Sequence, residues 1–265
     1  MTSGVIALIA AWLITSAAQA DFIDIGVVGD YLFHPLIRKG ARNTVVLSVA
    51  AQAVGVALGL LFAIGRMSRN VPARAVSGFY IWFFRGTPVL VQLLFWFNGV
   101  PSVFRNLTIG IPFTDVTLFT TPMVEFMTPF VAALLGLGLN EGAYMAEIVR
   151  AGIESVDRGQ TEASSALGMT SATTLRRIVL PQAMRVIIPP TGNEFISMLK
   201  TSSLATVVTY AELMRRSQDI YSANFQVLPL LAVASLWYLA MTSVASVGQH
   251  YLEKRFNRGQ SIVYV

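Results

Sequence analysis

The chain has 265 residues and a net charge of +5, with 54% hydrophobic residues and only 12% charged ones. An ordinary soluble domain carries roughly 25% charged residues, so this composition argues against one and is typical of a protein embedded in lipid. No cysteine is present, which excludes a disulfide framework and any cysteine-ligated metal site.

Six segments approach the roughly 20 apolar residues that a helix needs to cross a bilayer core about 30 Å thick. They lie near residues 4–20, 43–65, 76–99, 129–148, 186–209 and 227–251. The first ends in Ala-Gln-Ala before Asp21, like a signal-peptidase site, but no Lys or Arg precedes it. We therefore expect 1–20 to be a retained membrane helix, with an uncleaved signal-like segment as the alternative. Residues 21–42 are predicted to be an amphipathic segment on the outer surface.

The basic residues indicate how the chain lies in the membrane. With six crossings and the N-terminus inside, the outer loops hold only Arg38, Lys39, Arg42, Arg105, Arg215 and Arg216. The inner loops hold Arg66, Arg69, Arg74, Arg150, Arg158, Arg176, Arg177, Arg185, Lys254, Arg255 and Arg258. Because cytoplasmic loops carry the excess of Lys and Arg, both termini are predicted to be cytoplasmic. The positive charge follows this topology, so we expect membrane lipid and no nucleic acid as a partner.

Two features stand out in the second and third segments. Ala51, Gly55 and Gly59 recur every four residues, a pattern that lets another helix approach closely. Arg85-Gly86-Thr87-Pro88 lies inside the apolar run 79–97, and the proline predicts a kink because it removes one backbone hydrogen bond. The arginine is either a side chain that reaches the membrane surface or part of a gate or subunit contact at that kink.

The outer loop that follows, 101–128, contains Pro101, Pro112 and Pro122. Proline at this density opposes a continuous helix, and the length of the loop indicates a functional insertion or a small outer cap.

Ionisable side chains inside or beside membrane spans usually face a bundle interior or a water-filled path. Glu141, Glu194 and Lys200 are of this kind, and together they supply both signs of charge that a zwitterionic solute needs. Equally, Glu194 and Lys200 could neutralise each other or lie at a helix boundary. The candidate pathway residues are Glu141, Tyr144, Glu194, Lys200, Thr201 and Ser202.

The segment 158–180 is the most specific feature of the chain. Ala163, Ala166 and Leu167 recur at helical spacing, and Gly168 can supply a left-handed turn. Thr170 or Ser171 can cap a new helix. We predict two short helices joined at Gly168, lying outside the bilayer and docked on another protein, because neither is long enough to fold alone. Pro181 is predicted to separate the second of them from the next span.

Enzyme signatures are missing from the sequence. There is no GxxxxGK[ST] phosphate loop, no HExxH and no GxSxG. His34 and His250, the two histidines, fall on opposite sides of the membrane and cannot share a metal ion. We expect a chain without catalytic activity, so that any uphill transport draws its energy from another polypeptide.

The segment 158–180 resembles the cytoplasmic signature of the membrane subunits of ATP-binding-cassette (ABC) importers. That signature is Glu-Ala-Ala, three residues, Gly, nine residues, Ile, one residue and Leu-Pro. Here it stands as Glu162-Ala163-Ser164, Gly168, Ile178 and Leu180-Pro181, with Ser164 as the one departure. Other segments are similar to the polar amino-acid branch of the family, the histidine and glutamine permease type. They are RGTPVLVQ (85–92), GAYMAEIVR (142–150), GQ (159–160), LPQ (180–182) and NEFI (193–196).

The resemblance implies an all-α membrane protein, a type I ABC importer-like helical bundle with five core spans, one N-terminal helix and cytoplasmic coupling helices. The permease domain is then 43–258 and the C-terminal tail 259–265. The residues expected to couple to the ATPase are Glu162, Ala163, Ser164, Ala166, Leu167, Gly168, Ile178, Leu180 and Pro181.

The resemblance also implies the partners and the location. They are two cytoplasmic ABC ATPase subunits that bind ATP and Mg, a second permease subunit, identical or paralogous, and an external solute-binding protein. This chain binds no cofactor itself, and the location is a bacterial cytoplasmic (inner) membrane.

The expected solute is a polar amino acid. Relatives that import cationic amino acids often carry Asp after the lysine, where this chain has Thr201 after Lys200, which favours a neutral or acidic solute. Two alternatives remain: a non-transporting membrane anchor that recruits a cytoplasmic ATPase or enzyme, and an exporter or channel with its own gate.

Overall fold

The computed structural model describes residues 24–111 and 117–256. The predicted N-terminal helix 1–20 and the C-terminal tail 259–265 lie outside these residues. The elements in chain order are α2 (Ile25–Leu32), α3 (Pro35–Met67), α4 (Val71–Gly86), α5 (Val89–Leu94), η1 (Phe95–Gly99), α6 (Val100–Val103), β1 (Asn106–Gly110), β2 (Thr117–Pro122), α7 (Met123–Phe126), α8 (Pro129–Glu154), α9 (Arg158–Ala166), α10 (Ser171–Thr174), η2 (Leu175–Val179), α11 (Leu180–Thr201), η3 (Ser202–Val208), α12 (Leu213–Asn224) and α13 (Val227–Phe256). The elements η1 and η2 are π-helical, and η3 is a 3-10 helix.

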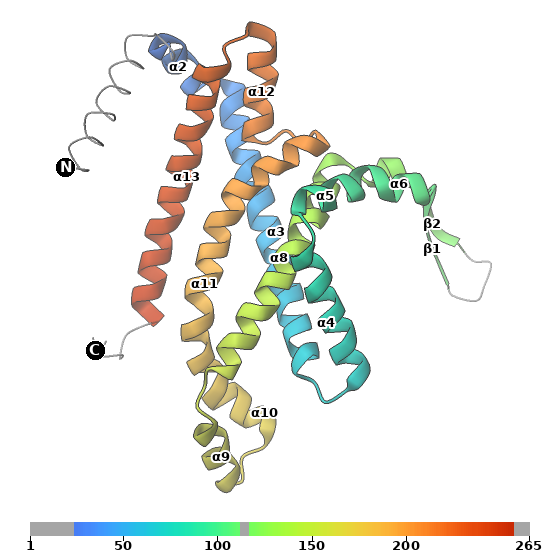
Figure 1. Cartoon of the computed structure of the whole chain (residues 1–265), viewed down its shortest axis with the longest axis vertical. Helices are drawn as coiled ribbons and strands as arrows, with labels where there is room; N and C mark the ends of the chain where they lie inside the picture. Colours follow the sequence, from blue (N-terminus) through green and yellow to red (C-terminus); the bar gives the residue numbers. More distant parts are fainter. Residues whose placement is uncertain (1–23, 112–116, 257–265) are drawn as a thin grey trace, which may run out of the picture.

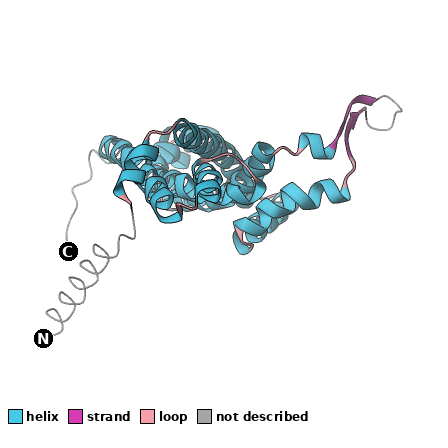
Figure 2. Ribbon diagram, turned by 90° about the horizontal axis from the view of Figure 1, so that it is seen from above, coloured by secondary structure: helices cyan, strands magenta, loops and turns pink. Residues whose placement is uncertain are grey.

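Four long helices, α3, α8, α11 and α13, run along the long axis of the molecule (Figure 1). The short helices α9 and α10 lie at one end, and α2 and α12 lie at the other. Helix α8 is central because it packs against α3, α4, α5 and α11. The hairpin β1–β2 projects sideways, away from the bundle, when the molecule is seen from above (Figure 2).

Two of the described helices, α3 and α13, are long and apolar enough to cross a membrane. Helix α4 and residues 89–103 are together also long and apolar enough to cross a membrane, as one span that is bent by 104°. Helix α8 covers the predicted segment 129–148, and α11 followed by η3 covers most of 186–209, but α8 and α11 carry the polar residues of the bundle centre. The count of six crossings therefore stays a prediction.

The predicted small-residue stripe packs α3 against α8. A Cβ atom at Gly55 would collide with the side chain of Glu141, and one at Gly59 would collide with Met145. Ala51 is fully buried between the same helices. The backbones of α3 and α8 can approach this closely only because these positions lack large side chains, and the close approach fixes Glu141 in the bundle.

The start of α3 differs from the sequence-based expectation. Helix α3 begins at Pro35, where the sequence analysis placed an amphipathic segment up to residue 42. Proline is well suited to the first helical turn, and the side chain of His34 caps it by accepting a hydrogen bond from Leu36 N at 3.3 Å. The helix therefore extends into the polar residues that precede the apolar run.

The outer insertion contains no long helix in its described part, as its prolines predict. It forms an antiparallel hairpin, in which Ile109 pairs with Phe119 and Thr108 pairs with Thr120, followed by the short helix α7. The hairpin was not predicted, because its strands are only five and six residues long and lack a clear alternation of apolar and polar residues.

Candidate functional site

The segment 158–180, called the coupling segment from here on, begins with α9. Asp157 caps this helix by accepting a hydrogen bond from Gly159 N at 2.6 Å. At its end, Gly168 N donates to Ser165 O and Met169 N donates to Ser164 O, both at 3.0 Å. These two bonds form a Schellman motif, which requires a left-handed residue after the helix. Gly168 has φ of +75°, so the predicted glycine bend is confirmed.

The second half of the coupling segment starts as predicted but ends differently. Thr170 caps α10 by accepting a hydrogen bond from Thr173 N at 3.3 Å. The chain then stays helical through η2 into α11, so the prediction that Pro181 separates two helices was wrong. A proline ring normally clashes with the carbonyl four residues earlier, and here that residue, Arg177, lies in the π-helical turn. The wider turn gives the ring room, and Gln182 Nε2 donates to Ile178 O at 3.0 Å.

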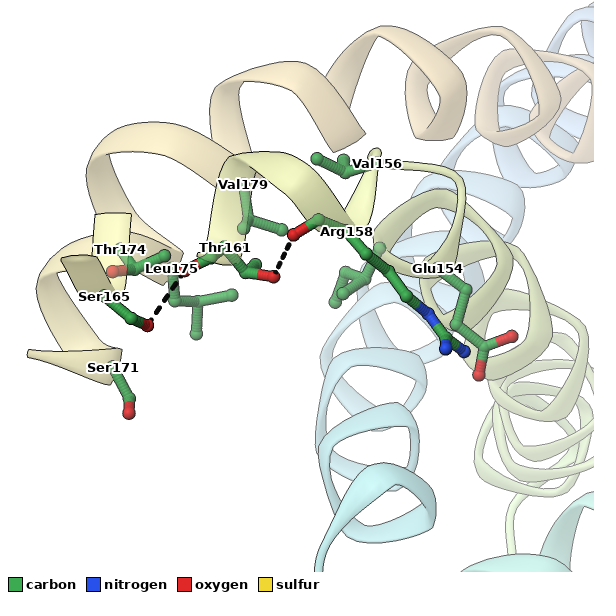
Figure 3. A pocket seen from close by; sticks show the side chains of 10 residues that line it. Glu154, Val156, Arg158, Thr161, Ser165, Ser171, Thr174, Leu175 and Val179 are labelled. Carbon is green, nitrogen blue, oxygen red and sulfur yellow. Dashed lines mark hydrogen bonds between the residues drawn. The ribbon is translucent and has the colours of Figure 1, made fainter. Parts of the chain in front are cut away.

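A cavity of about 550 Å³ lies between the end of α8, α9 and η2 (Figure 3). Hydrogen bonds within α9 shape its wall, from Thr161 Oγ1 to Arg158 O at 2.7 Å and from Ser165 Oγ to Thr161 O at 2.9 Å. The tip of the segment faces outward, and Leu167 is 82% exposed. The other exposed residues among the expected coupling positions are Glu162, Ala163, Ala166, Gly168, Leu180 and Pro181. The described chain leaves this apolar tip uncovered, as expected of a surface that docks on another protein.

The predicted kink at Gly86-Thr87-Pro88 is confirmed as a complete break, because α4 ends at Gly86 and the chain turns by 104°. A broken helix leaves backbone carbonyls without partners. Here Phe84 O accepts hydrogen bonds from Asn140 Nδ2 at 2.8 Å and from Gln92 Nε2 at 3.0 Å. Gln92 Nε2 also lies 2.8 Å from Thr87 Oγ1. Two side-chain amides therefore stabilise the bent geometry of the break.

A second cavity, of about 440 Å³, lies beside this break and is called the central cavity from here on. Its walls come from the break, from α8 and from α11. The lining residues are Arg85, Gly86, Thr87, Pro88, Val89, Leu137, Asn140, Glu141, Tyr144, Glu194, Ser197, Met198 and Thr201. The break thus brings its own arginine into one space with carboxylates from two other helices.

The central cavity presents groups of both charge signs. Glu141 is only 4% exposed and accepts a hydrogen bond from Gln52 Nε2 at 3.1 Å. The guanidinium of Arg85 lies 5.2 Å from the ring centroid of Tyr144, a cation–π distance. Glu194 lines the cavity from α11. A guanidinium can bind a carboxylate through two parallel hydrogen bonds, and carboxylates can bind an ammonium group, so the arrangement can hold a zwitterion.

Not all of the candidate pathway residues meet in this cavity. Glu141, Tyr144, Glu194 and Thr201 line it, whereas Lys200 and Ser202 do not. Ser202 is buried and its Oγ donates to Leu199 O at 2.9 Å. Within the described residues there is no ion pair between Glu194 and Lys200. The two charges therefore do not neutralise each other.

Sequence reasoning missed three amides that shape this site, Gln52, Gln92 and Asn140. All three are uncharged polar residues in or beside apolar segments. A search for ionisable residues passes over them, although an amide in a hydrocarbon setting also needs a partner. Such a search extended to Gln and Asn would have found them, but not their partners.

Residues 55–258 match the family described as "Binding-protein-dependent transport system inner membrane component". Arginine transport system permease protein ArgU of Corynebacterium glutamicum is 45% identical over 98% of this chain and 81% of its own length. L-cystine transport system permease protein TcyB of Bacillus subtilis is 39% identical over 85% of this chain and 88% of its own length.

A solved structure described as a crystal structure of an amino acid ABC transporter with histidines is also similar. It superimposes with a TM-score of 0.74 at 36% identity, covering 88% of this chain and 99% of the compared chain. The helical arrangement and the sequence therefore point to the same group of proteins.

Proposed function

The chain belongs to the family of binding-protein-dependent transport system inner membrane components, and from this premise we propose which solute it carries and where that solute binds. It is the non-catalytic permease subunit of an amino-acid ABC importer, and ATP hydrolysis belongs to a separate ATPase. Membership in this family of transport components argues against the alternative of a non-transporting membrane anchor. Two ATPases carrying ATP and Mg, a second permease subunit and an external binding protein complete the assembly that we propose.

The solute that we propose is a polar amino acid held in the central cavity. The observation that carries the proposal is the meeting of Arg85, Glu141 and Glu194 in one space beside a broken helix. Arg85 would bind the carboxylate of the solute, and the two glutamates would bind its ammonium group. Arg85 and the break at 86–88 would form the gate, because the open turn is where the cavity wall can move.

We further propose a neutral or acidic amino acid as the preferred solute. The support is Thr201, which lines the central cavity where a carboxylate would favour a cationic side chain. A cationic amino acid is the second candidate, favoured by two carboxylates against one guanidinium in the cavity. The relative from Corynebacterium glutamicum, which is named for arginine, favours it too.

The test is binding of labelled amino acids to the purified complex, with Glu141→Gln as the variant. Glutamine at 141 can still accept the hydrogen bond from Gln52, so the fold is kept while the charge is lost. A hydrogen bond to a charged group is worth roughly 1.5–3 kcal/mol, so we expect binding to weaken by about tenfold or more. Glu125→Gln on the outer helix α7 is the matched control and should bind as the unaltered protein does. Equal binding by Glu141→Gln and Glu125→Gln would refute the proposed site.

Competition between labelled and unlabelled amino acids tests whether the preferred solute is neutral, acidic or cationic. Unlabelled glutamine or glutamate should displace the bound label better than arginine does, and Thr201→Asp should reverse this order by adding a carboxylate. If arginine competes best in the unaltered protein, the cationic candidate replaces the neutral or acidic one.

A further inference from the structure

A third cavity of about 450 Å³ lies between the central cavity and the coupling segment. Its lining residues are Arg66, Met67, Arg85, Glu147, Arg150 and Glu154, and it is called the inner cavity from here on. Three guanidinium groups face two carboxylates there, so the charged side chains leave an excess of one positive charge. The proposed function assigns no role to this cavity.

The three cavities follow one another along α8. Arg85 lines both the central and the inner cavity. Glu154 lines both the inner cavity and the cavity at the coupling segment. From Glu141 to Glu154, α8 rises about 20 Å at 1.5 Å per residue. One face of a single helix thus connects the centre of the bundle with its coupling end.

The carboxylates of the inner cavity are already occupied. Arg150 bonds to Glu147 at 2.7 Å and to Glu154 at 2.6 Å, so one guanidinium serves both acids. Arg66 and Arg85 make no ion pair among the described residues. Both are exposed at the cavity wall. The inner cavity therefore offers two guanidinium groups that lack an anionic partner.

Arg85 lines the central cavity together with Glu194, and it lines the inner cavity together with Arg66 and Glu147. An anion that leaves the central cavity can therefore stay in contact with Arg85 while it comes within reach of Arg66.

We propose that the inner cavity is a second binding site for the carboxylate of the solute, through which the solute passes from the central cavity to the cytoplasm. Arg85 contacts the carboxylate in both positions, and Arg66 binds it only in the inner one. Arg150 pairs with both Glu147 and Glu154, so that Arg66 and Arg85 offset the one negative charge that remains and the cavity does not repel the passing carboxylate. This inference rests on the proposed function and assigns the release step to named residues.

The test uses the whole transporter, reconstituted in vesicles with its ATPases and its binding protein. The variant is Arg66→Gln, and the matched control is Arg69→Gln, a neighbouring arginine that does not line the inner cavity. We expect Arg66→Gln to lower the maximal uptake rate of the labelled amino acid by about tenfold. Its equilibrium binding to the central cavity should stay within about twofold of the control, because Arg66 does not line that space.

Inhibition from inside the vesicle separates a release site from a merely structural role. Unlabelled amino acid loaded on the cytoplasmic side should slow uptake by the unaltered protein. For Arg66→Gln, the internal concentration that slows uptake to the same extent should be about ten times higher. Arg66→Lys keeps the charge and should restore part of this sensitivity. Because Arg66→Lys is the milder change, its sensitivity to internal amino acid tests the inner site if Arg66→Gln does not assemble.

Three outcomes would contradict these expectations in different ways. If Arg66→Gln matches Arg69→Gln in uptake and in internal inhibition, the inner site does not exist. If internal phosphate inhibits as strongly as internal amino acid, the cavity is a general anion site and the inference is wrong. If the unaltered transporter binds none of glutamine, glutamate, arginine and cystine, the proposed function itself fails.

Discussion

The coupling segment and the central cavity are held together in opposite ways. In the coupling segment, the hydrogen bonds that set the shape join residues within five positions of each other, as from Met169 N to Ser164 O. In the central cavity, two of the shaping hydrogen bonds join distant parts of the chain, Gln52 to Glu141 and Asn140 to Phe84. The first region can keep its form while it moves as a unit. The second changes its form whenever the helices move relative to one another.

This difference suits the two tasks of a permease. A docking element must present the same surface throughout the cycle, and a short helix with both ends capped does so. A solute cavity must open and close, and bonds between separate helices are broken and remade when the helices shift. The predictions that follow test this division of roles, beginning with the largest effect.

Loss of the docking surface should abolish transport. We expect replacement of residues 162–168 by seven Gly and Ser residues to release the ATPase during purification and to reduce uptake to background. The physical reason is that the exposed apolar tip around Leu167 is then missing, while the chain length and the membrane helices are unchanged. Co-purification of the ATPase and uptake by vesicles measure the effect, and membrane insertion of the variant is the control. Retention of the ATPase with full coupling would contradict the role of the segment.

A single change at Gly168 should disconnect hydrolysis from transport. An L-residue in the left-handed region costs roughly 1–2 kcal/mol, and valine is among the least suited because it is β-branched. Gly168→Val should therefore keep the ATPase bound but lower the amino acid taken up per ATP hydrolysed by about tenfold. Gly168→Asn, which tolerates this conformation, should lower it much less.

Gly29→Val is the matched control, because Gly29 lies in α2 at the other end of the molecule and no atom lies within 4 Å of an added Cβ. If Gly168→Val takes up as much amino acid per ATP hydrolysed as Gly29→Val does, the bend is not needed for coupling.

The same contrast explains how far sequence reasoning reached. For the coupling segment, the sequence predicted the left-handed glycine and limited the cap to Thr170 or Ser171, because caps and turns depend on neighbouring residues. Pro181 misled the prediction, because a π-helical turn that accommodates a proline leaves no distinct sequence signal.

For the central cavity, the sequence revealed the charged residues and the kink but not their geometry. It could not show that Lys200 lies outside the cavity while Thr201, the next residue, lines it. It could not pair Gln52 with Glu141, because 89 positions separate them and only the packing of α3 on α8 brings them together. Pairings of this kind depend on the tertiary structure and not on any local pattern.

The smallest effect that we expect concerns the amides that hold the helix break. Gln92→Leu removes the hydrogen bonds to Phe84 O and Thr87 but keeps the size of the side chain, and Phe84 O retains its bond from Asn140. Each lost hydrogen bond costs about 0.5–1.5 kcal/mol, so a drop in thermal stability of the complex should result, with solute binding weakened by a few-fold. Gln92→Leu combined with Asn140→Leu leaves that carbonyl without either side-chain donor, and the loss should then exceed the sum of the single changes. A strictly additive pair would mean that the two amides act independently, and the break would not depend on their shared acceptor.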